Sequence, residues 1–152
     1  MNFTKLTSLF AFVTLAVLSL GFASAQTSSC ITLQSSSFPN SVVNTQSSFT
    51  ATFILNNTGI GCAVARNVTG VIFISTLNGN NAGVSWALNT NLPATIAVGQ
   101  LSSFTATFNV SAGSFGTLIN SISVSTTTQA GSQDPNSPYI FPLPSVTITQ
   151  PS

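Results

Sequence analysis

Apolar and polar residues alternate with a period of two along most of the chain. In the clearest segment, Phe49, Ala51, Phe53 and Leu55 fall on one side of an extended backbone, and the residues between them fall on the other. No window has the i, i+3, i+4, i+7 spacing of an amphipathic helix. The alternation therefore predicts an all-β fold.

Seven segments are predicted to be strands because they carry alternating or β-branched residues and are bounded by clusters of Gly, Pro, Asn or Ser. They are 30–34, 49–55, 67–76, 83–88, 102–108, 117–126 and 140–149. About seven short antiparallel strands in a chain of this length predict a β-sandwich.

A short repeat links two of these strands. The run Ser47–Phe53 recurs as Ser102–Phe108, and the likeness does not extend to the flanking residues. Two half-chains would be too small to bury separate cores. We interpret the repeat as two strands that meet the same packing demand within one domain.

Segment 67–76 departs from simple alternation. Val68, Ile72 and Ile74 are expected on one face, and Val71 and Phe73 on the other. A strand that is apolar on both faces is covered on both sides. Either a loop shields its outer face, or that face contacts another subunit.

The first 25 residues are typical of a secretory signal peptide. They contain one charge, Lys5, then an apolar stretch around Leu9–Leu20, and they end in Ala23, Ser24 and Ala25. The apolar stretch is shorter than the ~20 residues of a spanning helix. We therefore expect a signal peptide at 1–25, one domain at 26–152, secretion to the extracellular space or cell surface, and no membrane span in the mature chain.

Charge is almost absent from the mature chain. The sequence has two basic residues, one acidic residue and no histidine, so cleavage at residue 25 leaves only Arg66 and Asp134. One arginine cannot neutralise several phosphates, which excludes nucleic acid as a partner. A surface without net charge also lacks the repulsion that keeps copies apart.

The same inventory argues against catalysis. A hydrolytic triad would lack its imidazole, a glycosidase its second carboxylate, and a zinc or calcium centre its ligands. The sequence therefore predicts no enzyme activity, no catalytic residue, no metal site and no cofactor.

The few chemically distinctive side chains have structural explanations. Asp134 lies in a turn-forming sequence, where Asp normally caps the local backbone, and Arg66 either pairs with it or faces solvent. Trp86 shares a face with its apolar neighbours two positions away, so a core position is favoured over a sugar-stacking surface. The polar stretch from Gly131 to Pro138 is interpreted as a linker that lets Tyr139–Ser152 swing away.

Two cysteines and three glycosylation sequons remain after export. Cys30 and Cys62 predict one disulfide, within the chain in the simplest interpretation and between subunits in the alternative. Asn56, Asn67 and Asn109 each begin an Asn-X-Ser/Thr sequon and are candidates for N-linked glycans.

Several short motifs between Ser47 and Thr128 resemble a known class of cell-surface domain. They include Asn57-Thr58-Gly59, Ala65-Arg66-Asn67-Val68-Thr69 and Ile96-Ala97-Val98-Gly99-Gln100, followed by the second Phe/Thr strand. This pattern resembles the immunoglobulin-like CARDB and DUF11 domains. The resemblance implies an immunoglobulin-like sandwich and says little about function.

A single neutral domain with sequons is also similar to the thread-like filament subunits of thermoacidophilic archaea. That resemblance implies polymerisation by donor-strand complementation, in which a terminal strand of one subunit completes the sheet of the next. The candidate donors are 26–35, with Ile31 and Leu33 on one face, and 139–150, with Val146 and Ile148. A disulfide from Cys30 within the subunit would hold the first donor in place.

These observations predict a non-enzymatic structural subunit of an extracellular filament, pilus or surface layer. Its main partner would be further copies of the same chain. The alternative is a monomeric adhesin or carbohydrate-binding module that uses Trp86 or Tyr139 as a stacking surface.

Overall fold

The computed structural model describes residues 29–44, 48–59, 63–78 and 83–150. The predicted signal peptide at 1–25 lies outside these ranges, as do the first residues of the N-terminal donor candidate, 26–28. Within the described residues the chain forms nine strands. They are β1 (Ile31–Ser37), β2 (Ser41–Val43), β3 (Ser48–Asn57), β4 (Arg66–Leu77), β5 (Val84–Leu88), β6 (Ala94–Ile96), β7 (Leu101–Val110), β8 (Gly116–Thr128) and β9 (Tyr139–Thr149).

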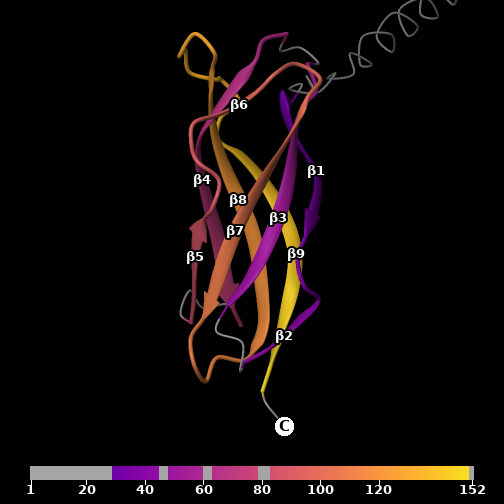
Figure 1. Cartoon of the computed structure of the whole chain (residues 1–152), viewed down its shortest axis with the longest axis vertical. Helices are drawn as coiled ribbons and strands as arrows, with labels where there is room; N and C mark the ends of the chain where they lie inside the picture. The colour runs from indigo at the N-terminus through magenta and orange to yellow at the C-terminus, as the bar shows by residue number, and fades with distance from the viewer. Residues whose placement is uncertain (1–28, 45–47, 60–62, 79–82, 151–152) are drawn as a thin grey trace, which may run out of the picture.

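The strands form two sheets packed face to face (Figure 1). One sheet has four strands in the order β1-β3-β7-β5, and the other has five in the order β2-β9-β8-β4-β6. Neighbouring strands are antiparallel except β2 and β9, which are parallel. The predicted all-β, immunoglobulin-like sandwich is confirmed. The additional strands β2 and β6 have three residues each, too few for an alternating pattern to reveal.

The repeated sequence motif lies at the centre of the four-stranded sheet. Its two copies fall on β3 and β7, which pair antiparallel so that Phe49 faces Phe108 and Phe53 faces Phe104. Because Phe-Thr-Ala-Thr-Phe is the same sequence in both directions, antiparallel pairing places each residue opposite its own kind. The facing rings are nearly parallel, with centroids 5.1 and 5.2 Å apart, a geometry that adds to burial energy.

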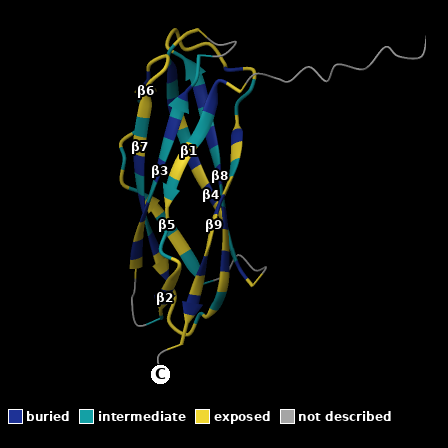
Figure 2. Cartoon of the chain, turned by 90° about the vertical axis from the view of Figure 1, so that its right-hand side faces the viewer, coloured by how far each residue is buried: buried dark blue, intermediate teal, exposed yellow. Residues whose placement is uncertain are grey.

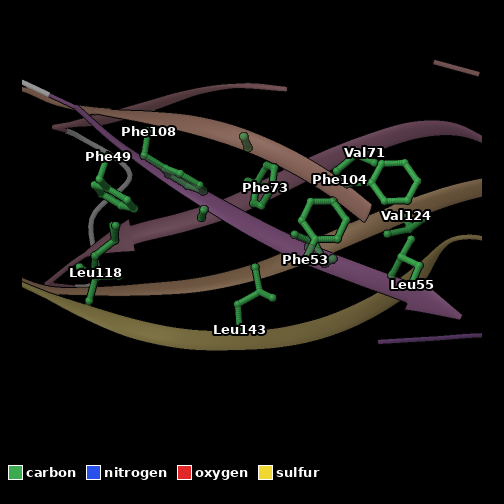
Figure 3. Packing of buried hydrophobic residues seen from close by; sticks show 14 of the residues in the cluster. Phe49, Phe53, Leu55, Val71, Phe73, Phe104, Phe108, Leu118, Val124 and Leu143 are labelled. Atoms are coloured by element: carbon green, nitrogen blue, oxygen red, sulfur yellow. The ribbon is translucent and has the colours of Figure 1, made fainter. Parts of the chain in front are cut away.

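Phe73 of β4 joins the two sheets (Figure 3). Its ring meets Phe53, Phe108 and Trp86 edge to face, with centroid distances between 5.0 and 5.7 Å. Residues of both sheets fill the space around these rings, and the core extends along the sandwich through Leu118, Val124 and Leu143. Buried and exposed positions alternate along the strands that enclose it (Figure 2).

The predicted faces of segment 67–76 are wrong for Val68. A β-bulge shifts the register of β4 against β8 between Val68 and Gly70. One extra residue on the bulged strand moves Val68 to the inner side, where it is buried with Val71 and Phe73. Ile72 and Ile74 point outward, and because both are exposed, the predicted shielding by a loop of this chain is also wrong.

Candidate functional site

The two charged side chains of the described residues meet in one buried corner, which consists of Arg66, Thr126, Asp134 and Tyr139. The Asp134 Oδ2 atom accepts hydrogen bonds from Arg66 Nε at 3.0 Å, Thr126 Oγ1 at 2.7 Å and the Tyr139 hydroxyl at 2.8 Å. Its Oδ1 atom accepts the backbone N–H of Asn136 at 3.1 Å. All four corner residues are buried. Asp134 thus caps its local turn as predicted, and Arg66 takes the paired alternative.

The corner holds Asp134 in its charged form. Burial alone would raise the pKa of this carboxyl, but the hydrogen bonds from Thr126, Asn136 and Tyr139 and the charge of Arg66 outweigh it and lower the pKa below 3.8. The carboxylate has no exposed surface. Its hydrogen bonds join residues of β4, β8 and β9 and so stabilise the fold.

Tyr139 is perturbed in the opposite sense. Burial, and then the hydrogen bond to Asp134 and its negative charge, raise the pKa of the Tyr139 hydroxyl to about 12. Its ring lies parallel to that of Phe141, with centroids 6.3 Å apart. Because Tyr139 is buried, it offers no surface on which a sugar could stack.

The segment predicted as a free linker, Gly131–Pro138, is tied to the sandwich. Asp134 joins the corner, and the backbone N–H of Ser137 donates to the Asp134 carbonyl at 3.0 Å. The Ser137 hydroxyl accepts the backbone N–H of Thr126 at 2.9 Å. This segment is therefore not the flexible hinge that its composition predicts.

Cys30 borders the same corner. It is fully buried and disulfide-bonded, and Arg66 Nη2 lies 3.5 Å from its Sγ atom. Its predicted partner, Cys62, lies outside the described residues. The choice between an intramolecular and an intermolecular bridge stays a prediction.

One side of the sandwich, seen on the left in Figure 1, is an open flank. We define it as β5 together with residues 70–77 of β4. Strand β6 pairs with β4 only at Arg66–Val68, and β5 pairs only with β7. In the described residues, no strand pairs with the outer edge of β4 from Gly70 to Leu77, although β5 of the other sheet lies close to β4.

A groove of about 260 Å³ runs along the open flank. Residues of both sheets line it, namely Phe73, Ile74, Ser75, Val84 and Trp86. The Ser75 hydroxyl donates to the Oδ1 atom of buried Asn120 at 2.8 Å. The groove thus combines apolar side chains with polar atoms, and the polar atoms make up the larger part of its lining surface. The Trp86 ring packs against that of Phe73, with centroids 5.0 Å apart, so Trp86 faces the core as predicted. It lies at the margin of the core and is only partly buried.

The flank formed by β1, β2 and β9 is better protected than the open flank. A register shift between Leu33 and Ser35 distorts β1, and Pro142 and Pro144 interrupt the part of β9 that β2 leaves uncovered. Bulges and prolines are the usual means by which proteins prevent an edge from pairing with another chain. Residues 70–77 of β4 contain no proline, no charge and no bulge.

Both candidate donor segments are docked in their own domain. Ile31 is buried and Leu33 partly buried on β1, which pairs only with β3. Val146 and Ile148 are buried on β9, which pairs with β8 on one side and with β2 on the other. Releasing β1 breaks one strand pairing, whereas releasing β9 breaks two.

The three sequons differ in exposure. Asn109 is exposed on the outer face of the four-stranded sheet, as its position opposite Phe108 predicts. Asn67 is partly buried, and its Oδ1 atom accepts the Thr95 hydroxyl at 2.7 Å. Asn56 is partly buried, and its Oδ1 atom has no hydrogen-bond partner.

The described residues contain no helix long and apolar enough to cross a membrane. They also contain no cluster of three or more His, Cys, Asp or Glu side chains that could hold a metal ion.

Comparisons with known proteins found similarity to solved structures at low sequence identity. No family model and no curated protein matches it, so the CARDB and DUF11 resemblance stays a prediction. It is similar to the secreted serine protease VesC from Vibrio cholerae (12% identity, TM-score 0.46), covering 78% of this chain and 23% of that one. It is also similar to a PapD-like domain of human CEP192 (9% identity, TM-score 0.47, 81% and 87% covered). Vibrio cholerae VesB protease matches at 16% identity and TM-score 0.41, over 76% and 31%.

The chain spans under a third of either protease chain.

Proposed function

We propose that this protein is a non-enzymatic structural subunit of an extracellular filament or surface layer, and that its copies assemble by adding a β-strand of one subunit to the sheet of the next. The observation that carries the proposal is the open flank. There, eight consecutive residues of β4, Gly70–Leu77, pair with no strand on their outer side among the described residues.

An unpaired strand edge attracts another strand because its N–H and C=O groups lack protein partners. Strand addition satisfies them with main-chain hydrogen bonds, and alternate side chains of the incoming strand fill adjacent pockets. The groove beside β4 supplies such a pocket, with Phe73, Val84 and Trp86 as its apolar lining. An extended segment with apolar residues at every second position fits both features.

The placement of charge supports self-association. Arg66 and Asp134 neutralise each other in the buried corner, and Lys5 lies in the predicted signal peptide. The outside of the mature domain then has no charged side chain with which copies could repel each other. Assembly by this route is expected to be insensitive to salt, because there are few charges to screen.

Substitutions on the two sides of β5 test the proposal. Val84→Lys places an ammonium group in the groove, whereas Ser85→Lys adds the same charge on the outward side of the same strand. We expect negative-stain microscopy of the secreted protein to show filaments for the wild type and Ser85→Lys and no filaments for Val84→Lys. Filaments from Val84→Lys, or a wild type that stays monomeric and binds glycans, would overturn the proposal.

The donor strand is tested separately. A donated β1 must carry the Cys30 disulfide between subunits or be released by its reduction, whereas a donated β9 leaves that disulfide untouched. Denaturing gels without reductant distinguish these routes: a ladder of covalent oligomers identifies β1. A monomer band, with filament yield unchanged by reductant, identifies β9.

A further inference from the structure

A second surface lies beside the open flank, on the outer face of the five-stranded sheet. Four isoleucines on this face have about half or more of their surface exposed: Ile72 (58%), Ile74 (49%), Ile119 (57%) and Ile140 (65%). We name these four residues, together with Ser121, Ser123 and Pro142, the isoleucine face. Single exposed apolar residues are normal in proteins, but a contiguous group on one face marks an interaction site.

The register of the sheet gives this face a defined relief. Ile72 of β4, Ser123 of β8 and Ile140 of β9 stand side by side in one row. The next row contains Ile74, Ser121 and Pro142. Since neighbouring strands are about 4.8 Å apart, two apolar ridges roughly 10 Å apart border a valley formed by Ser121 and Ser123 on β8, and exposed Ile119 of β8 closes one end of this valley.

The other sheet has a different outer surface. The outward positions of β3 and β7 are mostly polar and include Thr50, Thr52, Thr105, Thr107 and Asn109, while Ile54 and exposed Leu101 (57%) are their apolar members. The two outer faces of one sandwich therefore differ in kind, although every strand follows the same alternation. A uniformly hydrated monomer would not need this asymmetry.

We propose that the isoleucine face binds the isoleucine face of a second copy about a two-fold axis. In this arrangement the β4 ridge of each copy lies in the β8 valley of the other, so one contact satisfies both copies. The face has no charged side chain to desolvate. Aligned sheets pack about 10 Å apart with interdigitated side chains. The isoleucines of one copy placed above the small serines of the other copy allow the two sheets to approach to that distance.

Other occupants fit this face less well. A sugar ligand would need an aromatic platform, and none of the seven residues of the face is aromatic. An anionic membrane would need lysine or arginine beside the apolar patch, which the mature face lacks. The contact goes beyond the proposed strand addition, because it uses side chains of a sheet face and not the edge of β4.

The size of the face sets the expected strength. An exposed patch of a few hundred Å² is common on monomers, while a stable interface buries about 800 Å² on each partner. The four isoleucines alone are too small an area for a specific contact, so the serine valley and Pro142 must also be buried in it. We expect a reversible dimer whose population rises with protein concentration.

Sedimentation equilibrium with Val84→Lys protein tests this contact apart from strand addition. If the face acts as proposed, Val84→Lys forms a concentration-dependent dimer. Adding Ser123→Arg, which fills the valley with a charged side chain, reduces the dimer fraction at least tenfold. Adding Thr107→Arg on the opposite sheet leaves the dimer unchanged. Equal thermal unfolding curves for both double variants show that neither has lost its fold.

A Val84→Lys protein that remains monomeric at every concentration, or a dimer that Ser123→Arg leaves intact, overturns the inference. So does a monomer that binds uncharged phosphatidylcholine vesicles through the same face. Persistence of filaments in Val84→Lys instead contradicts the proposed function alone. In that case the Ser123→Arg substitution is added to Val84→Lys. If it changes neither the filament yield nor the dimer fraction in solution, the face contact is overturned as well.

Discussion

The buried corner and the open flank use opposite kinds of residue in opposite places. The corner encloses both charged side chains of the described residues, with Asp134 bound by three side chains, whereas the flank leaves apolar side chains of a groove and an unpaired strand edge at the surface. Most proteins place charge outside to remain apart and apolar groups inside to fold. Here charge fixes the interior, and the surface is left without a barrier to association.

The corner is expected to respond most strongly to mutation. Asp134→Ala leaves Arg66 buried without a counter-charge and removes the acceptor for Thr126 and Tyr139. Breaking a buried ion pair in this way lowers the free energy of unfolding by about 3–5 kcal/mol. Urea denaturation followed by Trp86 fluorescence at low protein concentration measures the loss. Exposed Thr50→Ala is the control, with a change within about 0.5 kcal/mol, and an equally small loss for Asp134→Ala would show that the corner is dispensable.

Alkaline pH gives the next largest effect. The pKa of Tyr139 is about 12 in the folded protein and about 10 when unfolded, so the unfolded state loses the phenolic proton first. Stability is therefore intact below pH 10 and falls as pH rises to about 12, by roughly 2–3 kcal/mol at about 1.4 kcal/mol per pH unit.

The measurement for Tyr139 is direct because the chain has one tyrosine. Phenolate absorbance of the folded protein should titrate near pH 12, and urea denaturation between pH 9 and 12 should follow the predicted decline. In Tyr139→Phe the decline disappears, although the protein is less stable at neutral pH since Asp134 loses a donor. An ordinary tyrosine titration near pH 10 in the folded protein would contradict the buried hydrogen bond.

Alternation predicted the strands well because each one has a single buried side, but it could not predict the polar interior. Asn57 and Asn120 are fully buried, and Asn57 Nδ2 donates to the carbonyls of Val64 and Ile96 at 3.0 and 3.1 Å. In the sequence, Asn57 belongs to a turn motif, and its partners become neighbours only through the fold. The bulge at Val68 was missed for the same reason, since one inserted residue reverses the faces that follow.

The candidate site depends on which strand edge remains unpaired, and the order of residue types along the chain does not show this. The sequence identified Trp86 as facing the core and segment 67–76 as apolar on both sides. It did not reveal that β6 ends its pairing with β4 at Val68, and this early end creates the open flank. Arg66 and Asp134 were recognised as a candidate pair, yet their burial depends on Tyr139 and Thr126, which lie on different strands.

The smallest expected effect separates residues that hold the fold from residues that face a partner. Ile74 lies on the open flank with about half of its surface exposed, so Ile74→Ser should change the free energy of unfolding of the Val84→Lys monomer by less than about 0.5 kcal/mol. Its inward neighbour Phe73 is buried against three aromatic rings, and Phe73→Ala should lower the same free energy by about 3–5 kcal/mol. Urea denaturation of both variants provides the comparison. A loss above 1 kcal/mol for Ile74→Ser would place Ile74 among the residues that stabilise the single domain. A negligible loss means that its apolar side chain contributes nothing to folding, so that any effect of Ile74→Ser on assembly is then an effect on contacts between copies.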